Sequence, residues 1–250
     1  MNSPRRVAWV TGAGKGISRA LAIRLAKDGW TVAASARTQA DLDALATEVP
    51  AIHAFPLDVT DAAANDRVIA EIEQSLGAIA LAVLNAGTYV PTGVAPFQAD
   101  AFRSQFEVNV FGTINGLAPL LPRFIARKAG QVAVVASVAG YRGLPSAAAY
   151  GATKSALINM CEALKLELEP HGVVVNVICP GFVKTPLTDK NAFPMPFLIS
   201  AEEAADHIAR GLASNRFEIA FPWVFATIMK TLRILPYSVF FAIGRLTRPR

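Results

Sequence analysis

Short apolar runs rich in Val, Ala and Ile alternate along the chain with longer Ala- and Leu-rich segments of helical pattern. This alternation is typical of βαβ units around a parallel sheet, whose strands are apolar on both faces because helices cover both faces. We therefore expect an α/β fold of the Rossmann type: a doubly wound, mainly parallel sheet flanked by helices on both faces. The runs that predict strands are residues 6–12, 31–37, 51–58, 78–87, 130–137 and 173–181.

The chain has no repeat, low-complexity tract or linker that would divide its 250 residues. A chain of this length can bury one large core, so we expect a single domain over residues 1–250. Two helix starts show capping patterns, Thr38 with Asp41 and Ser200 with Glu203. Residues 221–250 form a basic, aromatic-rich apolar C-terminal segment.

Composition and charge exclude several classes of protein. The net charge of +5 is modest and most basic residues are interspersed with acidic ones, so no nucleic-acid partner is expected. Cys161 and Cys179 form no CxxC pair and the three histidines are isolated, which predicts neither a disulfide framework nor a metal site. The first six residues lead directly into an apolar run and leave no room for a signal sequence. We expect a cytoplasmic protein in a reducing compartment.

A glycine-rich turn follows the first predicted strand. The segment "TGAGKGIS" places Gly12, Gly14 and Gly16 immediately before a helical pattern. Glycines at a strand-to-helix turn let the backbone approach a pyrophosphate, and the helix N-terminus offers unpaired N–H groups to it. The spacing is not that of the common GxGxxG fingerprint, so a plain tight turn is the alternative interpretation.

A tyrosine and a lysine four residues apart lie in an otherwise small and apolar stretch. Tyr150 and Lys154 fall on one face of a predicted helix, so their polar ends lie together. A cation beside a phenol favours the phenolate and moves its pKa from about 10 toward neutrality, where proton transfer is efficient. The pair therefore predicts a general acid/base site. A chance pair on an amphipathic surface helix is the alternative.

Together these motifs resemble the short-chain dehydrogenase/reductase family, in its single-domain form of roughly this length. The resemblance extends from residue 6 to about 220. At the position where the family usually has a third glycine, this chain has Ser18. The ordered motifs are TGxxxGxx (residues 11–18), NAG (85–87), Asn109, Ser137, the Tyr150/Lys154 pair and PGFVKT (180–185).

The resemblance implies a catalytic role for four residues. Tyr150 would donate a proton to a carbonyl oxygen or take one from an alcohol, and Lys154 would also bind the nicotinamide ribose. Ser137, thirteen residues before Tyr150, would polarise the substrate oxygen, although a serine at a strand end is more often a turn or cap residue. Ser146 is the nearest competitor and fits the spacing less well. Asn109 would hold a water in a proton relay through Lys154.

The resemblance also implies the cofactor-binding residues. Asp58 would contact the adenine, with an ordinary loop aspartate as the alternative, and the NAG segment would pass near the adenine ribose. The PGFVKT segment would line the nicotinamide, with Val183 offering backbone groups to the carboxamide and Thr185 a hydroxyl. The implied set is Gly12, Gly14, Lys15, Gly16, Ile17, Arg37, Asp58, Asn85, Ala86, Gly87, Tyr150, Lys154, Pro180, Gly181, Val183 and Thr185.

The end of the second predicted strand indicates the choice of cofactor. A family member that uses NAD would usually carry an acid near Ala36 to bind the ribose 2′-OH, whereas Arg37 stands here. Lys15 adds a second cation, and two cations suit the 2′-phosphate of NADP(H). We therefore expect NADP(H), although Arg37 alone could be a solvated surface residue.

These features predict an NADP(H)-dependent oxidoreductase that passes hydride between nicotinamide and a carbonyl or alcohol carbon, with reduction as the expected direction. The segment from Thr185 to Ser200 is expected to form a lid, in which Phe193, Met195 and Phe197 suggest an apolar small-molecule substrate. A non-catalytic NADP-binding regulator and a membrane-surface interaction protein are the alternatives.

Residues 219–250 contain five basic residues and no acidic one, which equals the whole net charge of +5. Two apolar runs, 219–229 and 234–244, are each shorter than the roughly 20 residues needed to cross a bilayer. Aromatic and basic residues together favour a segment that lies on a membrane surface. A subunit contact or a cover over the substrate pocket is the alternative with similar weight. The family resemblance further implies a homodimer or homotetramer, paired through the helices around Asn109 and Tyr150.

Overall fold

A single seven-stranded parallel sheet organises the chain. The computed structural model describes residues 6–190, 194–214 and 216–246. The strand order is β3-β2-β1-β4-β5-β6-β7, and every pair is parallel. The strands are β1 (Val7–Thr11), β2 (Thr31–Ser35), β3 (Ile52–Ala54), β4 (Ile79–Leu84), β5 (Gly130–Val135), β6 (Val173–Pro180) and β7 (Glu218–Phe221).

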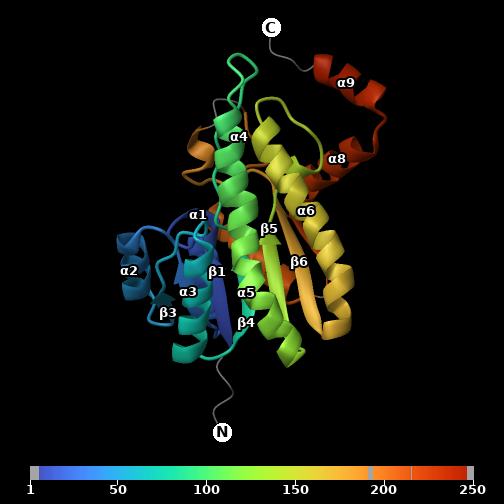
Figure 1. Ribbon diagram of the computed structural model, residues 1–250. Helices are drawn as coiled ribbons and strands as arrows, with labels where there is room; N and C mark the ends of the chain where they lie inside the picture. Colours follow the sequence, from blue (N-terminus) through green and yellow to red (C-terminus); the bar gives the residue numbers. More distant parts are fainter. Residues whose placement is uncertain (1–5, 191–193, 215, 247–250) are drawn as a thin grey trace.

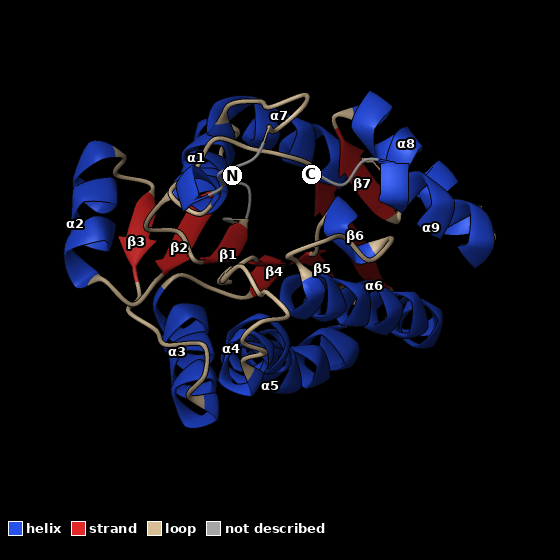
Figure 2. Cartoon of the chain, turned by 90° about the horizontal axis from the view of Figure 1, so that it is seen from above, coloured by secondary structure: helices blue, strands red, loops and turns tan. Residues whose placement is uncertain are grey.

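Helices cover both faces of the sheet (Figures 1 and 2). Helices α1 and α7 pack together on one face, and α3, α5 and α6 lie on the other. The expected doubly wound α/β architecture is thereby confirmed. The helices are α1 (Gly16–Lys27), α2 (Gln39–Glu48), α3 (Ala62–Ser75), α4 (Ala99–Phe106), α5 (Gly112–Arg127), α6 (Ala148–Leu168), α7 (Ala201–Leu212), α8 (Trp223–Ile234) and α9 (Tyr237–Leu246).

The direction of winding reverses between β1 and β4. After β1 the chain builds β2 and β3 on one side, then returns to place β4 against the other side of β1. In open α/β sheets, ligands bind beyond the carboxyl ends of the strands at such a switch point. The turn after β1 and the turn after β4 therefore lie together at the place where a ligand is expected.

Two apolar layers, one on each side of the sheet, hold the elements together. Strand residues alternate between them: Trp9 belongs to the layer under α3, α5 and α6, whereas Val10 belongs to the layer under α1 and α7. Trp9 is fully buried, and its indole N–H donates to the Ser35 hydroxyl at 3.0 Å. Successive residues of a strand face opposite layers, and both layers are apolar. The strands are therefore continuous apolar runs, which is why six of them could be predicted from the sequence.

The two predicted helix caps differ in outcome. Ser200 and Glu203 form the expected capping box at the start of α7. Thr38 does precede α2, but its side chain makes no capping hydrogen bond, so that part of the prediction was wrong. Asp41 instead turns toward the glycine turn, where its carboxylate pairs with Lys15.

The C-terminal segment begins differently from its predicted form. The apolar run that starts at Ile219 opens with β7, whose Ile219 and Phe221 are buried against α7. Helix α8 follows and packs Ala226 and Met229 into the core, whereas α9 lies beyond the edge of the sheet and is largely exposed (Figure 2). Within the described part of the chain, no helix combines the length and apolar character that crossing a bilayer requires.

Candidate active site

The glycine turn forms a close contact with the loop after β4. Gly12 has φ +71°, and a Cβ there would lie 3.0 Å from Cα of Ala86, so a side chain is excluded on both grounds. Helix α1 begins directly afterwards at Gly16, and its N-cap residue Lys15 makes no side-chain capping bond. The first N–H groups of α1 thus lie open at the switch point, as an anion would require.

Ser18, the departure from the family pattern, is part of a hydrogen-bonded connection between β1 and β4. Its hydroxyl donates to the Thr11 carbonyl at 3.0 Å and accepts from the Asn85 side-chain amide at 2.6 Å. The Thr11 hydroxyl oxygen in turn accepts from the backbone N–H groups of Asn85 and Ala86. Ser18 is fully buried, so it packs in the space of a glycine and adds two hydrogen bonds.

Ser137 and Tyr150 lie together beyond the carboxyl end of β5. Ser137 lies two residues after that strand, and its hydroxyl donates to the Pro180 carbonyl at 3.3 Å. Tyr150 lies in the first turn of α6, which comes close because Gly140 has no side chain: a Cβ there would lie 2.7 Å from the Lys154 carbonyl carbon. The hydroxyl of Tyr150 interacts with that of Ser137. The structure thus brings together the two hydroxyls that the sequence paired.

Lys154 is anchored beneath Tyr150. Its ammonium group donates to the Val135 carbonyl at 2.8 Å and lies 5.6 Å from the centre of the Tyr150 ring. The side chain is buried, with 4% of its surface exposed. A buried cation is therefore held at a fixed position between the last residue of β5 and the phenol.

The expected lowering of the Tyr150 pKa is not present in this structure. Burial raises the pKa of Tyr150 to about 12, and the Ser137 hydrogen bond lowers it by less than burial raises it. Burial also lowers the pKa of Lys154 to about 8. Both shifts have one physical cause, since a group removed from water is harder to charge. Near neutral pH the pair is a protonated phenol beside an ammonium ion, a state suited to donating a proton.

Asn109 lies in a π-helical turn, Glu107–Phe111, between α4 and α5. Its amide oxygen accepts from the Thr88 N–H at 2.7 Å, and its NH₂ group donates to the Thr88 carbonyl and to the Thr153 hydroxyl. The amide oxygen has two lone pairs and accepts from one N–H group here, so it can accept one further hydrogen bond. Asn109 therefore joins the loop after β4 to α6, and π-helical turns are frequent at functional sites.

Two hollows meet at Ser137 and Tyr150. The first, of about 250 Å³, extends from the glycine turn to Lys154. The second, of about 450 Å³, is lined mainly by apolar side chains and extends toward Phe182 and Phe225. The predicted residues that line the first are Gly12, Lys15, Gly16, Ile17, Asn85, Ala86, Gly87, Ser137, Tyr150, Lys154, Pro180, Gly181, Val183 and Thr185.

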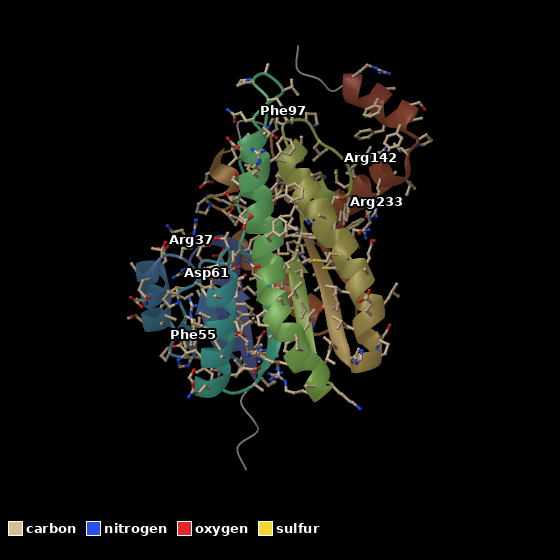
Figure 3. All side chains as sticks on the ribbon, in the orientation of Figure 1. Arg37, Phe55, Asp61, Phe97, Arg142 and Arg233 are labelled. Carbon is tan, nitrogen blue, oxygen red and sulfur yellow. The ribbon has the colours of Figure 1, made fainter. Side chains whose placement is uncertain are left out.

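Three predicted cofactor residues lie outside that hollow, toward α2. Gly14 packs against Asp41, to which a Cβ at Gly14 would come within 3.1 Å. Arg37 is exposed after β2, where Figure 3 places it beside the loop that precedes α3. Asp58, in that loop, accepts hydrogen bonds from the backbone N–H and hydroxyl of Thr60, which lower its pKa, and Arg37 lowers it further.

The two cations assigned to a phosphate each have an acidic neighbour. Lys15 lies 3.4 Å from the Asp41 carboxylate, measured from Nζ to Oδ2, and Arg37 interacts with Asp58. The Lys15–Asp41 pair could not be predicted from the sequence, because Asp41 fits a helix-capping position equally well. The two carboxylates therefore compete with any bound phosphate for these cations.

Several side chains of the apolar hollow were missed by the sequence interpretation. Tyr89 packs edge-to-face on Tyr150, with ring centres 5.1 Å apart, and Leu144 and Pro145 come from the loop before α6. Only Tyr89 had a usable signal, since it lies two residues after the NAG motif. Ser146, the competitor to Ser137, lines the hollow but is exposed and has φ +58°.

Two residues of the expected lid, Leu187 and Thr188, line both hollows. Phe182, which precedes the lid segment, and Phe197, near its end, both stack on the ring of Phe225 in α8. The backbones of Val183 and Ile199 pair as an isolated bridge, which closes the segment into a loop. Phe193 lies outside the described residues.

Comparisons with known proteins agree with this geometry. A family model described as short chain dehydrogenase matches residues 6–193. An uncharacterized oxidoreductase of Myxococcus xanthus is 37% identical over 247 residues, which are 97% of this chain and 98% of that protein.

Solved structures are similar over most of the chain. A short-chain dehydrogenase from Streptomyces avermitilis has a TM-score of 0.82 at 26% identity, covering 98% of this chain and 100% of that one. A 3-ketoacyl-(acyl-carrier-protein) reductase from Brucella melitensis, solved in complex with NADH, has a TM-score of 0.80 at 27% identity. That match covers 87% of this chain and 96% of the Brucella chain.

Proposed function

This chain is an oxidoreductase of the short-chain dehydrogenase family, and we propose that it uses NADP(H) to reduce the carbonyl group of apolar ketones or aldehydes. One observation supports this proposal above all others. A hollow at the glycine turn and a second, apolar hollow meet where the hydroxyls of Ser137 and Tyr150 come together. A dinucleotide in the first and a carbonyl compound in the second would place their reacting carbons beside those hydroxyls.

The residues at the glycine turn fit a dinucleotide. The first N–H groups of α1 would bind the pyrophosphate, and Gly12, which has no side chain, lets the turn pass close to Ala86 in front of that helix end. Lys154 would bind the nicotinamide ribose, and the backbone of Val183 would meet the carboxamide. When bound, the nicotinamide supplies the hydride.

The chain's own side chains would supply the proton and the charge. Tyr150, protonated near neutral pH, donates its phenolic proton to the carbonyl oxygen as that oxygen becomes an alkoxide. Ser137, whose hydroxyl donates to the Pro180 carbonyl in this structure, would turn to donate a hydrogen bond to the same oxygen and so stabilise its negative charge. The ammonium of Lys154 stabilises the phenolate that Tyr150 becomes. Asn109 would hold the relay water through its remaining lone pair.

NADP(H) rather than NAD(H) is proposed from residues of this chain. Arg37 and Lys15 lie on the α2 side of the hollow, where the adenosine ribose would bind, and no acid stands at Ala36 or Arg37. The Brucella relative was solved with NADH, so the family alone does not decide the choice. Asp41 and Asp58 weaken the preference, because each lies beside one of the two cations.

The proposal is tested by following NADPH oxidation with a panel of polar and lipophilic aldehydes and ketones. Turnover with at least one lipophilic carbonyl compound is expected. A non-catalytic NADP-binding regulator would bind NADPH, measured by its fluorescence, without oxidising it in the presence of any carbonyl compound.

We also propose that the enzyme pairs with copies of itself through the outer faces of α5 and α6. Phe111, beside α5, and Ile114 within it have 50% and 37% of their surfaces exposed, which is unusual for large apolar side chains on neighbouring turns. Light scattering at working concentration should give the mass of a dimer or tetramer. A monomeric mass would contradict the proposal.

Helices α8 and α9 are proposed to contact a membrane surface. Ile234 and Val239 are 81% and 44% exposed and lie away from the core, and Arg245 is exposed nearby. Two of the segment's other cations are already paired, Lys230 with Glu218 and Arg233 with Glu162. Arg248 and Arg250 lie outside the described residues. Interfacial contact would therefore rely on apolar insertion, with a smaller electrostatic contribution.

Cosedimentation with vesicles of anionic lipid tests this contact. Ile234→Glu should reduce binding several-fold, because it places a charge at the most exposed apolar position of α8. Val174→Glu at the start of β6, where the valine is 40% exposed, is the control and should bind like the wild type. Truncation after Leu235 removes α9 and keeps the core residues of α8. Absence of wild-type cosedimentation at low salt would refute the proposal.

A further inference from the structure

A further hollow lies outside the two that form the site. It is a groove of about 860 Å³ between α9, the N-terminal half of α6 and the loop that joins β5 to α6. Protein interiors are normally close-packed, whereas the chain's own side chains leave this space beside α9 unfilled. Its volume is within the range of small-molecule sites.

The groove adjoins the apolar hollow of the proposed active site. Ala139, Leu144, Pro145 and Ala147 line both of them. The loop that joins β5 to α6 therefore carries Ser137 near its start. It faces Tyr150 on one side and α9 on the other. A molecule whose reacting end lies at the two hydroxyls could extend past Leu144 and Pro145 into the groove.

The two walls of the groove are apolar and complementary. The α6 wall carries small residues at positions 148, 151, 152 and 155, a spacing that places them on one helix face. The α9 wall carries Tyr237, Phe240, Phe241 and Gly244, which also share one face. Small side chains opposite flat aromatic rings form a narrow groove that suits an unbranched hydrocarbon chain.

Charge in the groove is limited to two guanidinium groups, with no acidic side chain among its lining residues. Arg142 is committed to holding α9 in place: it stacks on Tyr237 and Phe240 at 4.5 and 4.4 Å and donates to the carbonyls of Arg233 and Leu235. Figure 3 shows Arg142 where the loop before α6 meets the C-terminal helices. The position of α9, and hence the width of the groove, depends on this residue.

We propose that the groove binds the hydrocarbon tail of a long-chain substrate whose carbonyl group lies at Ser137 and Tyr150. This inference rests on the proposed function and adds to it a substrate class, unbranched carbonyl compounds with a chain long enough to reach α9. Val239 of α9 is 44% exposed and does not line the groove, so this side of the helix would face the membrane from which such a substrate would come.

Chain-length dependence of the reaction tests the groove. For 2-alkanones from 2-pentanone to 2-dodecanone, kcat/KM with NADPH should rise with length, by at most about fourfold for each methylene that becomes buried. At least a tenfold gain is expected between 2-pentanone and 2-decanone.

Ala152→Phe should remove that gain and leave 2-pentanone turnover unchanged, because Ala152 lines the groove and neither of the other two hollows. The matched control is Ala163→Phe, on the same helix and also exposed, which does not line the groove and should keep the gain. Turnover of 2-pentanone shows that each variant is folded.

The outcomes separate the groove from the proposed function. If 2-pentanone is reduced but length has no effect, the groove proposal is wrong and the function stands. If no carbonyl compound is reduced, calorimetry with 1-decanol and 1-pentanol decides the groove alone: tighter binding of decanol that Ala152→Phe removes supports it, and equal binding refutes it. If light scattering shows that Ala152→Phe dissociates an oligomer while the length dependence persists, a second copy covers the groove and the proposal is overturned.

Discussion

Replacement of Tyr150 by phenylalanine should lower kcat for carbonyl reduction by about 100- to 10,000-fold, the range typical of general acid–base catalysis. The variant keeps the ring that packs on Tyr89 and removes only the hydroxyl beside Ser137. The hydroxyl of Ser137 cannot also supply the proton, because its role is to turn from the Pro180 carbonyl and donate a hydrogen bond to the substrate oxygen. NADPH should still bind, because the glycine turn is unchanged.

Single-turnover kinetics and NADPH fluorescence measure the two effects separately. Tyr89→Phe is the matched control, because it removes a phenol from the same aromatic pair at the mouth of the apolar hollow. That variant should keep kcat within a few-fold of the wild type. Turnover of Tyr150→Phe within tenfold of the wild type would exclude the proposed proton donor.

The pH profile gives an independent readout of the same pair. The pKa of Lys154 is lowered to about 8, so the side chain is charged below that pH and neutral above it. Reduction needs the cation, and kcat/KM for NADPH, which reports the free enzyme, should therefore fall as the pH rises through about 8. Tyr150, with a pKa near 12, should add no titration between pH 6 and 10.

The sheet could be predicted from the sequence because its strands are buried on both faces and appear as continuous apolar runs. The strand β7 was missed for a physical reason: its four residues, Glu218–Phe221, run without a break into the apolar residues of α8. Apolar content alone does not distinguish a short edge strand from the helix that follows it. Only tertiary pairing with β6 identifies it.

The site was predicted more completely than its electrostatics. Motif order was enough to bring Ser137, Tyr150 and Lys154 together, since parallel topology places the ends of β1, β4, β5 and β6 at one edge. The pKa of Tyr150 could not be predicted, because its sign depends on how deeply α6 buries the phenol. The Lys15–Asp41 pair also escaped prediction, because it joins two elements whose separation no local pattern encodes.

Arg37→Ala should lower kcat/KM for NADPH by about tenfold or more and leave kcat/KM for NADH nearly unchanged. Only NADPH carries the 2′-phosphate, and hydrogen bonds between charged groups are stronger than neutral ones. Exposure of Arg37 to solvent limits the effect, as does the competing attraction of Asp58. The preference for NADPH therefore depends on a cation that solvent partly screens. Removal of this cation should still change kcat/KM for NADPH by a measurable factor.

The acidic neighbours make the prediction sharper, because they should act in the opposite direction. Asp41→Asn removes a carboxylate that lies 3.4 Å from the Lys15 ammonium, so it frees this cation for the phosphate and should raise the NADPH-to-NADH ratio of kcat/KM. Arg103→Ala, on an exposed arginine of α4, is the control for charge loss alone and should leave the ratio unchanged. Steady-state kinetics with each cofactor at low ionic strength measures all three variants, since screening would mask the differences. Equal efficiency of NADPH and NADH in the wild type, or parallel losses with both cofactors in Arg37→Ala, would show that the phosphate is not bound here.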